Sequence, residues 1–388
     1  MDVLTRERAK PALRYGGVHR LVDFALSTVA HSHITEVWVS VEYQVSSIDD
    51  HLSGGRPWSL DRNRGGFRRM VPQTGTGSPT EDGFAHGNAD LLLRLSAEIE
   101  ALGKPVTVVL SADSVFNIDL HPIIEEHLER GRTATLLTTE VTKREASDNV
   151  VVLARRDGTV TGVEVKPSSP SSGTVATEIF VYDTAALLKA LHSLRRELPG
   201  GEDGDSGLGD FGEHLLPRLI DTGRVVAVEI PGYWRDAGQP GQYLQAHRDL
   251  LAGKVDVFDH PDRPVVSRWQ DRPAARVADG AVVADSLLAP GVVVAGEVRR
   301  SVLGPGVRVE KGAYVEDCVL MEETVVRSGA QVRTAIIDER SELLPGARVG
   351  ATPTARLARD EDLVLIGQDC CIDAEVAPGV RLEPGSRT

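Results

Sequence analysis

The sequence predicts an α/β domain followed by a parallel β-helix, and two patterns in the chain carry that prediction. From Arg20 to about residue 240, segments typical of strands and helices alternate, as in an α/β protein with a mostly parallel sheet. From about residue 274, glycine-containing triplets recur at a nearly fixed period. A chain of 388 residues can bury two such cores. We therefore expect an α/β domain at 1–240, a linker at 241–273 and a β-helix at 274–388.

The strands of the first domain are predicted from runs of apolar and β-branched residues bounded by turn residues. The run at 106–110 is continuously apolar, which is typical of a strand buried on both faces. An Asp157-Gly158 pair divides 149–167 and predicts a hairpin. We expect further strands at 37–43, 134–141 and 176–183.

The helices are predicted from apolar spacing and from residues that start or stop a helix. We expect one helix at 88–103 with Asn88 as its cap, and another with Pro122 in its first turn that ends at Gly131. Asp210 is the expected cap of a helix that begins at Phe211. We also expect helices at 184–198, at 211–220 and, within the linker, at 242–251.

The second domain is predicted from a repeat. The first residues of its glycine triplets are spaced by 16, 16, 17 and 17 residues; they are Gly280, Gly296, Gly312, Gly329 and Gly346. Short apolar pieces recur between them at a similar period. This pattern predicts a hexapeptide-type parallel β-helix, in which each coil buries its apolar side against its neighbours. The repeat says little about chemistry, because such helices usually serve as scaffolds or subunit interfaces.

Composition excludes several functional classes. The formal net charge of −14 argues against nucleic acid or an acidic membrane surface as the main partner. The three cysteines have neither a disulfide framework nor zinc-ligand spacing. No apolar run reaches membrane-spanning length, and the N-terminus lacks the apolar region of a signal peptide. We expect a protein of the reducing cytoplasm with neither a nucleic-acid nor a membrane partner.

A basic segment at 5–23 surrounds the Gly16-Gly17 pair. Lys10 precedes Pro11, so its backbone is biased away from helix and its side chain projects from an extended segment. A cluster of basic side chains suits a polyphosphate, because ammonium groups neutralise phosphate oxygens. The alternative is a solvated basic loop.

Two aspartates are candidates for a metal site. Asp113 follows the strand at 106–110, and ligands of open parallel sheets bind beyond the carboxyl ends of the strands. Asp236 lies in the sharp loop PGYWRDAGQ. Two carboxylates from separate segments suit Mg²⁺, which completes its shell with phosphate and water oxygens. The alternatives are that Asp113 caps a turn and that Asp236 forms a structural pair with Arg235.

Several of these segments resemble the ADP-glucose pyrophosphorylases of the sugar-nucleotide pyrophosphorylase family. The similar segments are LTRERAKPAL at the N-terminus, SADSVFNID around Asp113 and YWRDAGQ around Asp236. The resemblance spans essentially the whole chain. It implies a Rossmann-like nucleotidyltransferase domain and a left-handed β-helix. It also implies synthesis of ADP-glucose and pyrophosphate from ATP and glucose 1-phosphate for glycogen or α-glucan synthesis, in homotetramers that sugar-phosphate effectors regulate.

The same resemblance implies roles for individual residues. Asp113 and Asp236 would hold the catalytic Mg²⁺, Lys10 would hold the β and γ phosphates, and Lys166 would bind the sugar 1-phosphate. Gly87 and Asp90 match the GTAD motif that lines the base. The remaining substrate-binding residues that it implies are Gln44, Gln73, Glu178 and Asp210.

Departures from the family pattern keep alternatives open. The apolar first strand and the GGxGxRL loop that precede the basic segment in the family are absent, from which we expect a natural chain that begins upstream of Met1. Ala176-Thr177-Glu178 replaces a Ser-Met-Gly segment, and Val165 replaces the glutamate before Lys166. These changes favour either a non-catalytic regulatory subunit or an enzyme for another base or sugar, such as UTP or mannose 1-phosphate.

Overall fold

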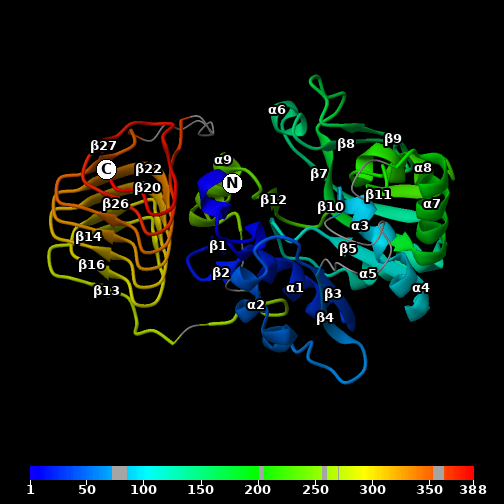
Figure 1. Ribbon diagram of the computed structural model, residues 1–388, viewed down its shortest axis with the longest axis horizontal. Coiled ribbons are helices and arrows are strands. Elements are labelled where there is room, and N and C mark those ends of the chain that lie inside the picture. The colour runs from blue at the N-terminus through cyan, green and yellow to red at the C-terminus, as the bar shows by residue number, and fades with distance from the viewer. Residues whose placement is uncertain (72–84, 201–204, 256–259, 270, 353–361) are drawn as a thin grey trace.

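The computed structural model describes residues 1–71, 85–200, 205–255, 260–269, 271–352 and 362–388. The β-helix stands at one end of the molecule and the main sheet of the α/β domain at the other (Figure 1). The N-terminal segment and helix α9 (Pro240–Leu251) lie between them. Gln73, a predicted substrate contact, lies outside the described residues.

The α/β domain contains a six-stranded mixed sheet in the order β11-β7-β10-β8-β9, with β5 also paired to β10. From the pairings, β5, β7, β8 and β11 run in one direction and β9 and β10 in the other. The predicted α/β class is therefore confirmed, and most strands of the sheet run in one direction, as predicted. The strand β10 runs against its three neighbours, so its ladders are antiparallel. The strands are β5 (Val106–Leu110), β7 (Ala134–Glu140), β8 (Val150–Ala154), β9 (Val160–Val165), β10 (Thr174–Asp183) and β11 (Val225–Glu229).

In the described part of the domain, three smaller sheets accompany the main sheet. Strands β3 (Glu36–Ser40) and β4 (Gly66–Met70) pair in parallel, β1 (Arg14–Tyr15) pairs with β2 (His19–Arg20), and β6 (Ser114–Phe116) pairs with β12 (Trp234–Asp236). The expectation that 106–110 is buried on both faces is wrong, because every residue of β5 is half-buried. Among the described residues β5 pairs only with β10, so no described strand covers its other edge.

The helices largely follow the predicted positions. The expected helix at 88–103 is divided at Leu95, and Gly87 rather than Asn88 is its N-cap. The expected helix at 211–220 begins with a π-helical turn, Phe211–Leu215. Together with α9, the described α-helices are α1 (Leu21–His31), α2 (Ser46–Leu52), α3 (Asn88–Arg94), α4 (Ser96–Leu102), α5 (His121–Glu129), α6 (Lys143–Ala146), α7 (Thr184–Glu197) and α8 (Leu216–Ile220), with 3₁₀ turns at Asp2–Thr5, Lys10–Ala12 and Ser53–Trp58.

The C-terminal domain is the predicted left-handed parallel β-helix. Its strands pair only in parallel, coil upon coil, around a core of small and β-branched residues such as Val298, Val315 and Val332. The strands are β13 (Arg276–Val277), β14 (Val282–Ala284), β15 (Leu287–Leu288), β16 (Val293–Val294), β17 (Glu297–Arg299), β18 (Val302–Leu303), β19 (Arg308–Val309), β20 (Tyr314–Leu320), β21 (Val325–Val326), β22 (Gln331–Ile337), β23 (Glu342–Leu343), β24 (Arg348–Val349), β25 (Val364–Ile366), β26 (Cys371–Ile372), β27 (Glu375–Val376) and β28 (Arg381–Leu382).

Helix α9 is packed between the two domains. Its residues Tyr243 and Leu244 share one buried cluster with Tyr15 of the α/β domain and with Val319 and Ile336 of the β-helix. The helix predicted inside the linker therefore contributes to a continuous core that fixes the N-terminal segment against the β-helix.

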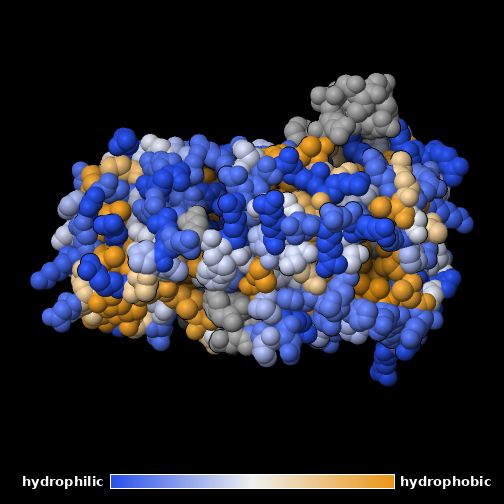
Figure 2. All heavy atoms as spheres, turned by 90° about the horizontal axis from the view of Figure 1, so that it is seen from below, coloured by the Kyte–Doolittle hydropathy of each residue, from blue (hydrophilic) through white to orange (hydrophobic). Residues whose placement is uncertain are grey.

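The surface is mostly polar on the face drawn in Figure 2, with apolar areas near both ends of the molecule. Exposed Val277 and Val282 belong to the first strands of the β-helix. Within the described residues, no helix is both long and apolar enough to cross a membrane.

Candidate active site

Strand pairing brings Asp113 and Asp236 together from distant parts of the chain. In the antiparallel pair β6–β12, Asp236 lies opposite Ser114, the residue that follows Asp113. The backbone N–H of Ala237 donates to the carbonyl oxygen of Asp113 at 3.2 Å. The two predicted metal ligands are therefore neighbours just beyond the carboxyl end of β5.

Lys10 contacts this pair of aspartates. Its Nζ lies 2.6 Å from Oδ2 of Asp113, and the Lys10 and Asp113 side chains are 37% and 21% exposed. The backbone N–H of Gly238 donates to Oδ1 of Asp236 at 2.7 Å. Gly238 has to be small, because a Cβ atom there would lie 2.5 Å from Lys10 Nζ and 2.7 Å from Asp236 Oδ1.

Glu178 adds a third carboxylate to the site. It occupies an irregularity in β10 between Ala176 and Phe180, with a left-handed φ of 57°. The Ser111 hydroxyl donates to Oδ1 of Asp113 and lies within hydrogen-bonding reach of Glu178, while the Ser111 N–H donates to the Glu178 carbonyl at 3.0 Å. The unusual backbone of Glu178 is thus fixed to the end of β5.

The electrostatics of the site follow from this crowding. Although Glu178 keeps exposed surface, the surrounding protein removes part of its hydration and, together with Asp113 and Asp236, raises its pKa to about 7. Burial and then the Asp113 charge raise the pKa of Asp236. Burial lowers the pKa of Lys10, but Asp113 and the other carboxylates outweigh this effect and raise it overall. Negative charge predominates, so the site favours a cation.

The donor set fits Mg²⁺. Among the described residues, no group of three or more His, Cys, Asp or Glu side chains is arranged to hold a metal ion. Mg²⁺ needs fewer, since it commonly takes one or two carboxylates and fills its remaining positions with phosphate and water oxygens. Asp113 and Asp236 supply two such carboxylates.

Lys166 lies at the end of the β8–β9 hairpin. Its φ is 43°, and its backbone N–H donates to the Asn149 carbonyl at 3.0 Å. The side chain is exposed, as is that of the preceding Val165. The hairpin thus presents this ammonium group to solvent from a constrained backbone.

Gly87 and Asp90 lie in the turn that begins α3, and the Asp210 side chain contacts this turn from the start of the π-helix. Asp90 is 1% exposed and accepts hydrogen bonds from the His86 N–H and from Arg94 Nε, both at 2.9 Å. Burial alone would raise the pKa of Asp90, but these hydrogen bonds and one from Ser206 lower it. Its carboxylate is therefore occupied by protein groups.

The other two residues join this turn to the start of the π-helix. Gly87 has a φ of 113°, and a Cβ atom there would overlap the backbone of Gly209. Oδ1 of Asp210 accepts a hydrogen bond from the Asn88 N–H at 3.1 Å. Gly87 therefore permits a close approach of two backbones, and Asp210 fixes the start of α3.

The rest of the basic segment does not converge on the aspartates. Arg8 Nη2 lies 2.9 Å from Oδ1 of Asp338, and Arg14 pairs with Glu322 of the β-helix. The prediction of one polyphosphate-binding cluster at 5–23 is therefore wrong for these two arginines, because β-helix carboxylates have taken them. Gln44 follows β3, and its side chain donates to the Arg6 carbonyl at 3.1 Å. It therefore holds the backbone of the basic segment.

Sequence reasoning missed the contributions of Gly238 and Arg235. Arg235 pairs with Glu145 of α6 at 3.1 Å and with Asp249 of α9 at 3.0 Å, so the alternative of an Arg235–Asp236 pair is wrong. These contacts fix β12 at the residue immediately before Asp236. The glycine two residues after an acidic residue was the available signal for Gly238, since close approach is a common reason for glycine in a sharp loop.

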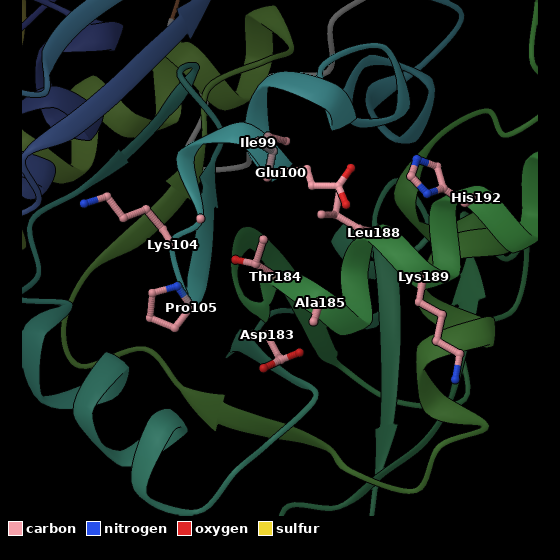
Figure 3. Close-up of a pocket in the computed structure, with 11 residues that line it drawn as sticks. Ile99, Glu100, Lys104, Pro105, Asp183, Thr184, Ala185, Leu188, Lys189 and His192 are labelled. Atoms are coloured by element: carbon pink, nitrogen blue, oxygen red, sulfur yellow. The ribbon is translucent and has the colours of Figure 1, made fainter.

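A cavity of about 420 Å³ adjoins Lys10. It extends between β3 and the end of β5, and its lining includes Lys10, Val39, Val41, Gly87 and Ala112. Another cavity, of about 480 Å³, lies at the opposite end of β5, beside Pro105 and Thr184. The Lys104 and Lys189 side chains point away from one another there (Figure 3). Of these two cavities, the one lined by Lys10 adjoins the Lys10–Asp113 ion pair.

The mixed sheet, the paired aspartates and the lysine beside an open cavity together form the candidate active site. Residues 2–253 match the family described as nucleotidyl transferase, and residues 273–361 match the GlmU-like C-terminal hexapeptide family. The chain belongs to the nucleotidyl transferase family, and it is an enzyme of the sugar nucleotidyltransferase type.

Three relatives share this organisation along most of their length. A glucose-1-phosphate adenylyltransferase of Thermomicrobium roseum is 34% identical over 98% of this chain and 88% of the relative. The protein of the same name from Acetivibrio thermocellus is 28% identical over 90% of this chain and 80% of its own. That of Thermotoga neapolitana is 31% identical over 81% of this chain and 73% of its own.

Proposed function

We propose that this protein makes ADP-glucose and pyrophosphate from ATP and glucose 1-phosphate. A phosphate oxygen of the sugar phosphate attacks the α-phosphorus of ATP, a new oxygen–phosphorus bond forms, and the bond from that phosphorus to the bridging oxygen of pyrophosphate breaks. The observation that supports this most is the meeting of Asp113 and Asp236 with Lys10, which lines the cavity. The names of the relatives supply the substrates.

Displacement at phosphorus depends on positioning and on neutralising charge. Asp113 and Asp236 would hold Mg²⁺, which supplies charge neutralisation at the α-phosphate when it is bound. Lys10 would pair with the β and γ phosphates, and Lys166 would orient the attacking sugar phosphate. Glu178 would face the hexose from its fixed position on β10.

The finer expectations remain proposals of the same kind. Gln44, Gly87 and Asp210 would shape the nucleotide site through their backbone contacts, and Asp90 would act by holding their turn. We also propose the domain limits 1–240, 241–273 and 274–388, a cytoplasmic homotetramer, and sugar-phosphate effectors that act where the two domains meet.

The test is pyrophosphate release from ATP and glucose 1-phosphate with Mg²⁺, in the wild type and in Asp236→Asn. Replacing a carboxylate that holds the metal should lower kcat by about 10²–10³-fold, the range typical of losing one group that stabilises transition-state charge. Asp221→Asn, at the exposed end of α8, is the matched control and should keep wild-type activity. A wild type that binds ADP-glucose but releases no pyrophosphate would overturn the proposal, as would full activity in Asp236→Asn.

A further inference from the structure

The Lys10 ammonium occupies the position beside Asp113 that a cation would take. Its Nζ is 2.6 Å from Asp113 Oδ2, the distance of a strong charge-assisted hydrogen bond. A Cβ atom placed on Gly238 would lie 2.5 Å from Lys10 Nζ and 2.7 Å from Asp236 Oδ1. The two atoms are thus no further apart than these distances combined, so the ammonium is close to both aspartates.

The neighbouring charges make this ammonium a substitute for a metal ion. Asp113, Asp236 and Glu178 all interact electrostatically with Lys10. A second cation that bound Asp113 Oδ2 would compete for the same oxygen and would be repelled by the ammonium at close range. Lys10 and a divalent ion therefore exclude one another from this oxygen.

The structure also allows the ammonium to leave. The backbone before Lys10 is fixed, because the Ala9 N–H donates to Ser47 Oγ at 2.8 Å and Pro11 restrains the next residue. The side chain is partly exposed, borders the cavity, and has a flexible four-carbon stem. A triphosphate in that cavity would give the ammonium another anionic partner.

We propose that Lys10 is a tethered counter-ion that occupies the metal position of the substrate-free site and has to leave Asp113 before a divalent ion binds. The nucleotide triphosphate draws Lys10 away, so that metal and nucleotide favour each other's binding. This inference rests on the proposed function, because it takes Asp113 and Asp236 as the metal ligands.

The test is a titration with Mn²⁺ in the absence of nucleotide. The electron paramagnetic resonance signal of free Mn²⁺ measures how much of the metal remains unbound. Lys10→Met should bind Mn²⁺ at least about tenfold more tightly than the wild type, since a unit charge a few ångströms away is removed. Lys104→Met removes the same charge at the opposite end of β5 and should change the affinity less than twofold. Equal affinities in the wild type and Lys10→Met would overturn the inference.

The same titration separates failure of the inference from failure of the metal site. Asp113→Asn should weaken Mn²⁺ binding in the Lys10→Met background. If Lys10→Met and Lys10→Met/Asp113→Asn bind Mn²⁺ equally, the metal site of the proposed function is wrong. If Asp113→Asn weakens binding but Lys10→Met does not strengthen it, the metal site stands and the counter-ion role is wrong.

A second measurement needs no substitution. Acetylation of Lys10 by a succinimidyl ester, followed by mass spectrometry of its peptide, reports whether the ammonium is held by Asp113. Adding Mg²⁺ alone to the wild type should increase the Lys10 rate several-fold relative to Lys104, because an ammonium group that has left Asp113 is more accessible to the ester. An unchanged ratio at saturating Mg²⁺ would contradict displacement.

Discussion

Replacing Gly238 by alanine should disturb catalysis while leaving the fold nearly intact. The new Cβ atom would lie 2.5 Å from Lys10 Nζ and 2.7 Å from Asp236 Oδ1. Ordinary contacts of a Cβ atom begin at 3.4 Å, so both groups have to move by several tenths of an ångström to about 0.9 Å. The atoms that move are the ends of side chains, and Gly238 does not have a left-handed φ, so the backbone has little reason to change.

The expected cost therefore falls on the reaction. A misplacement of about 1 Å in a reacting site can lower the rate by on the order of 10²-fold, because positioning supplies much of the acceleration. We expect kcat/KM for pyrophosphate release to fall by about that factor in Gly238→Ala. The melting temperature should stay within about 2 °C of the wild type, which corresponds to less than about 2 kcal/mol for a chain of this size.

Gly162→Ala is the matched control for this prediction. A Cβ atom at Gly162 would meet Leu153 at 3.8 Å, an ordinary contact, and Gly162 also lacks a left-handed φ. Its activity and melting temperature should both equal those of the wild type. Activity of Gly238→Ala within threefold of Gly162→Ala would refute the reasoning, and so would a loss of activity that only accompanies global unfolding.

Two further predictions concern the junction of the domains. Burial lowers the pKa of His247 to about 4. Between pH 6.5 and 4 the unfolded chain therefore gains a proton at this residue that the native state does not gain. The free energy of unfolding present above pH 6.5 is lost as the pH falls, by about 2 kcal/mol at pH 5. Denaturant unfolding at pH 7.5 and 5 should show this loss in the wild type but not in His247→Gln. Arg8→Met leaves the carboxylate of Asp338, which is 2% exposed, without its cationic partner and should cost about 3–5 kcal/mol. In a double-mutant cycle, Asp338→Asn should recover part of that loss, and strictly additive effects would contradict the pairing.

Local patterns identified most of the fold. The recurring glycine triplets predicted the β-helix because each coil repeats the same turn, and a repeat is visible without knowledge of distant contacts. The Asp157-Gly158 hairpin and helices α5 and α7 were likewise predicted from nearby turn and cap residues. The division of the helix at Leu95 was missed because the apolar spacing continues across it.

Lys10, Asp113 and Asp236 stand in recognisable segments, so the amino-acid order alone identifies them as candidates for the chemistry. Which of them come together depends on pairing between distant parts of the chain. The pairing of β6 with β12 joins residues more than a hundred positions apart, and no local pattern encodes such a register. The β-helix carboxylates that draw Arg8 away from the aspartates lie still further along the chain. Their pairing depends on docking of the two domains, so Lys10 faces the aspartates while its basic neighbour does not.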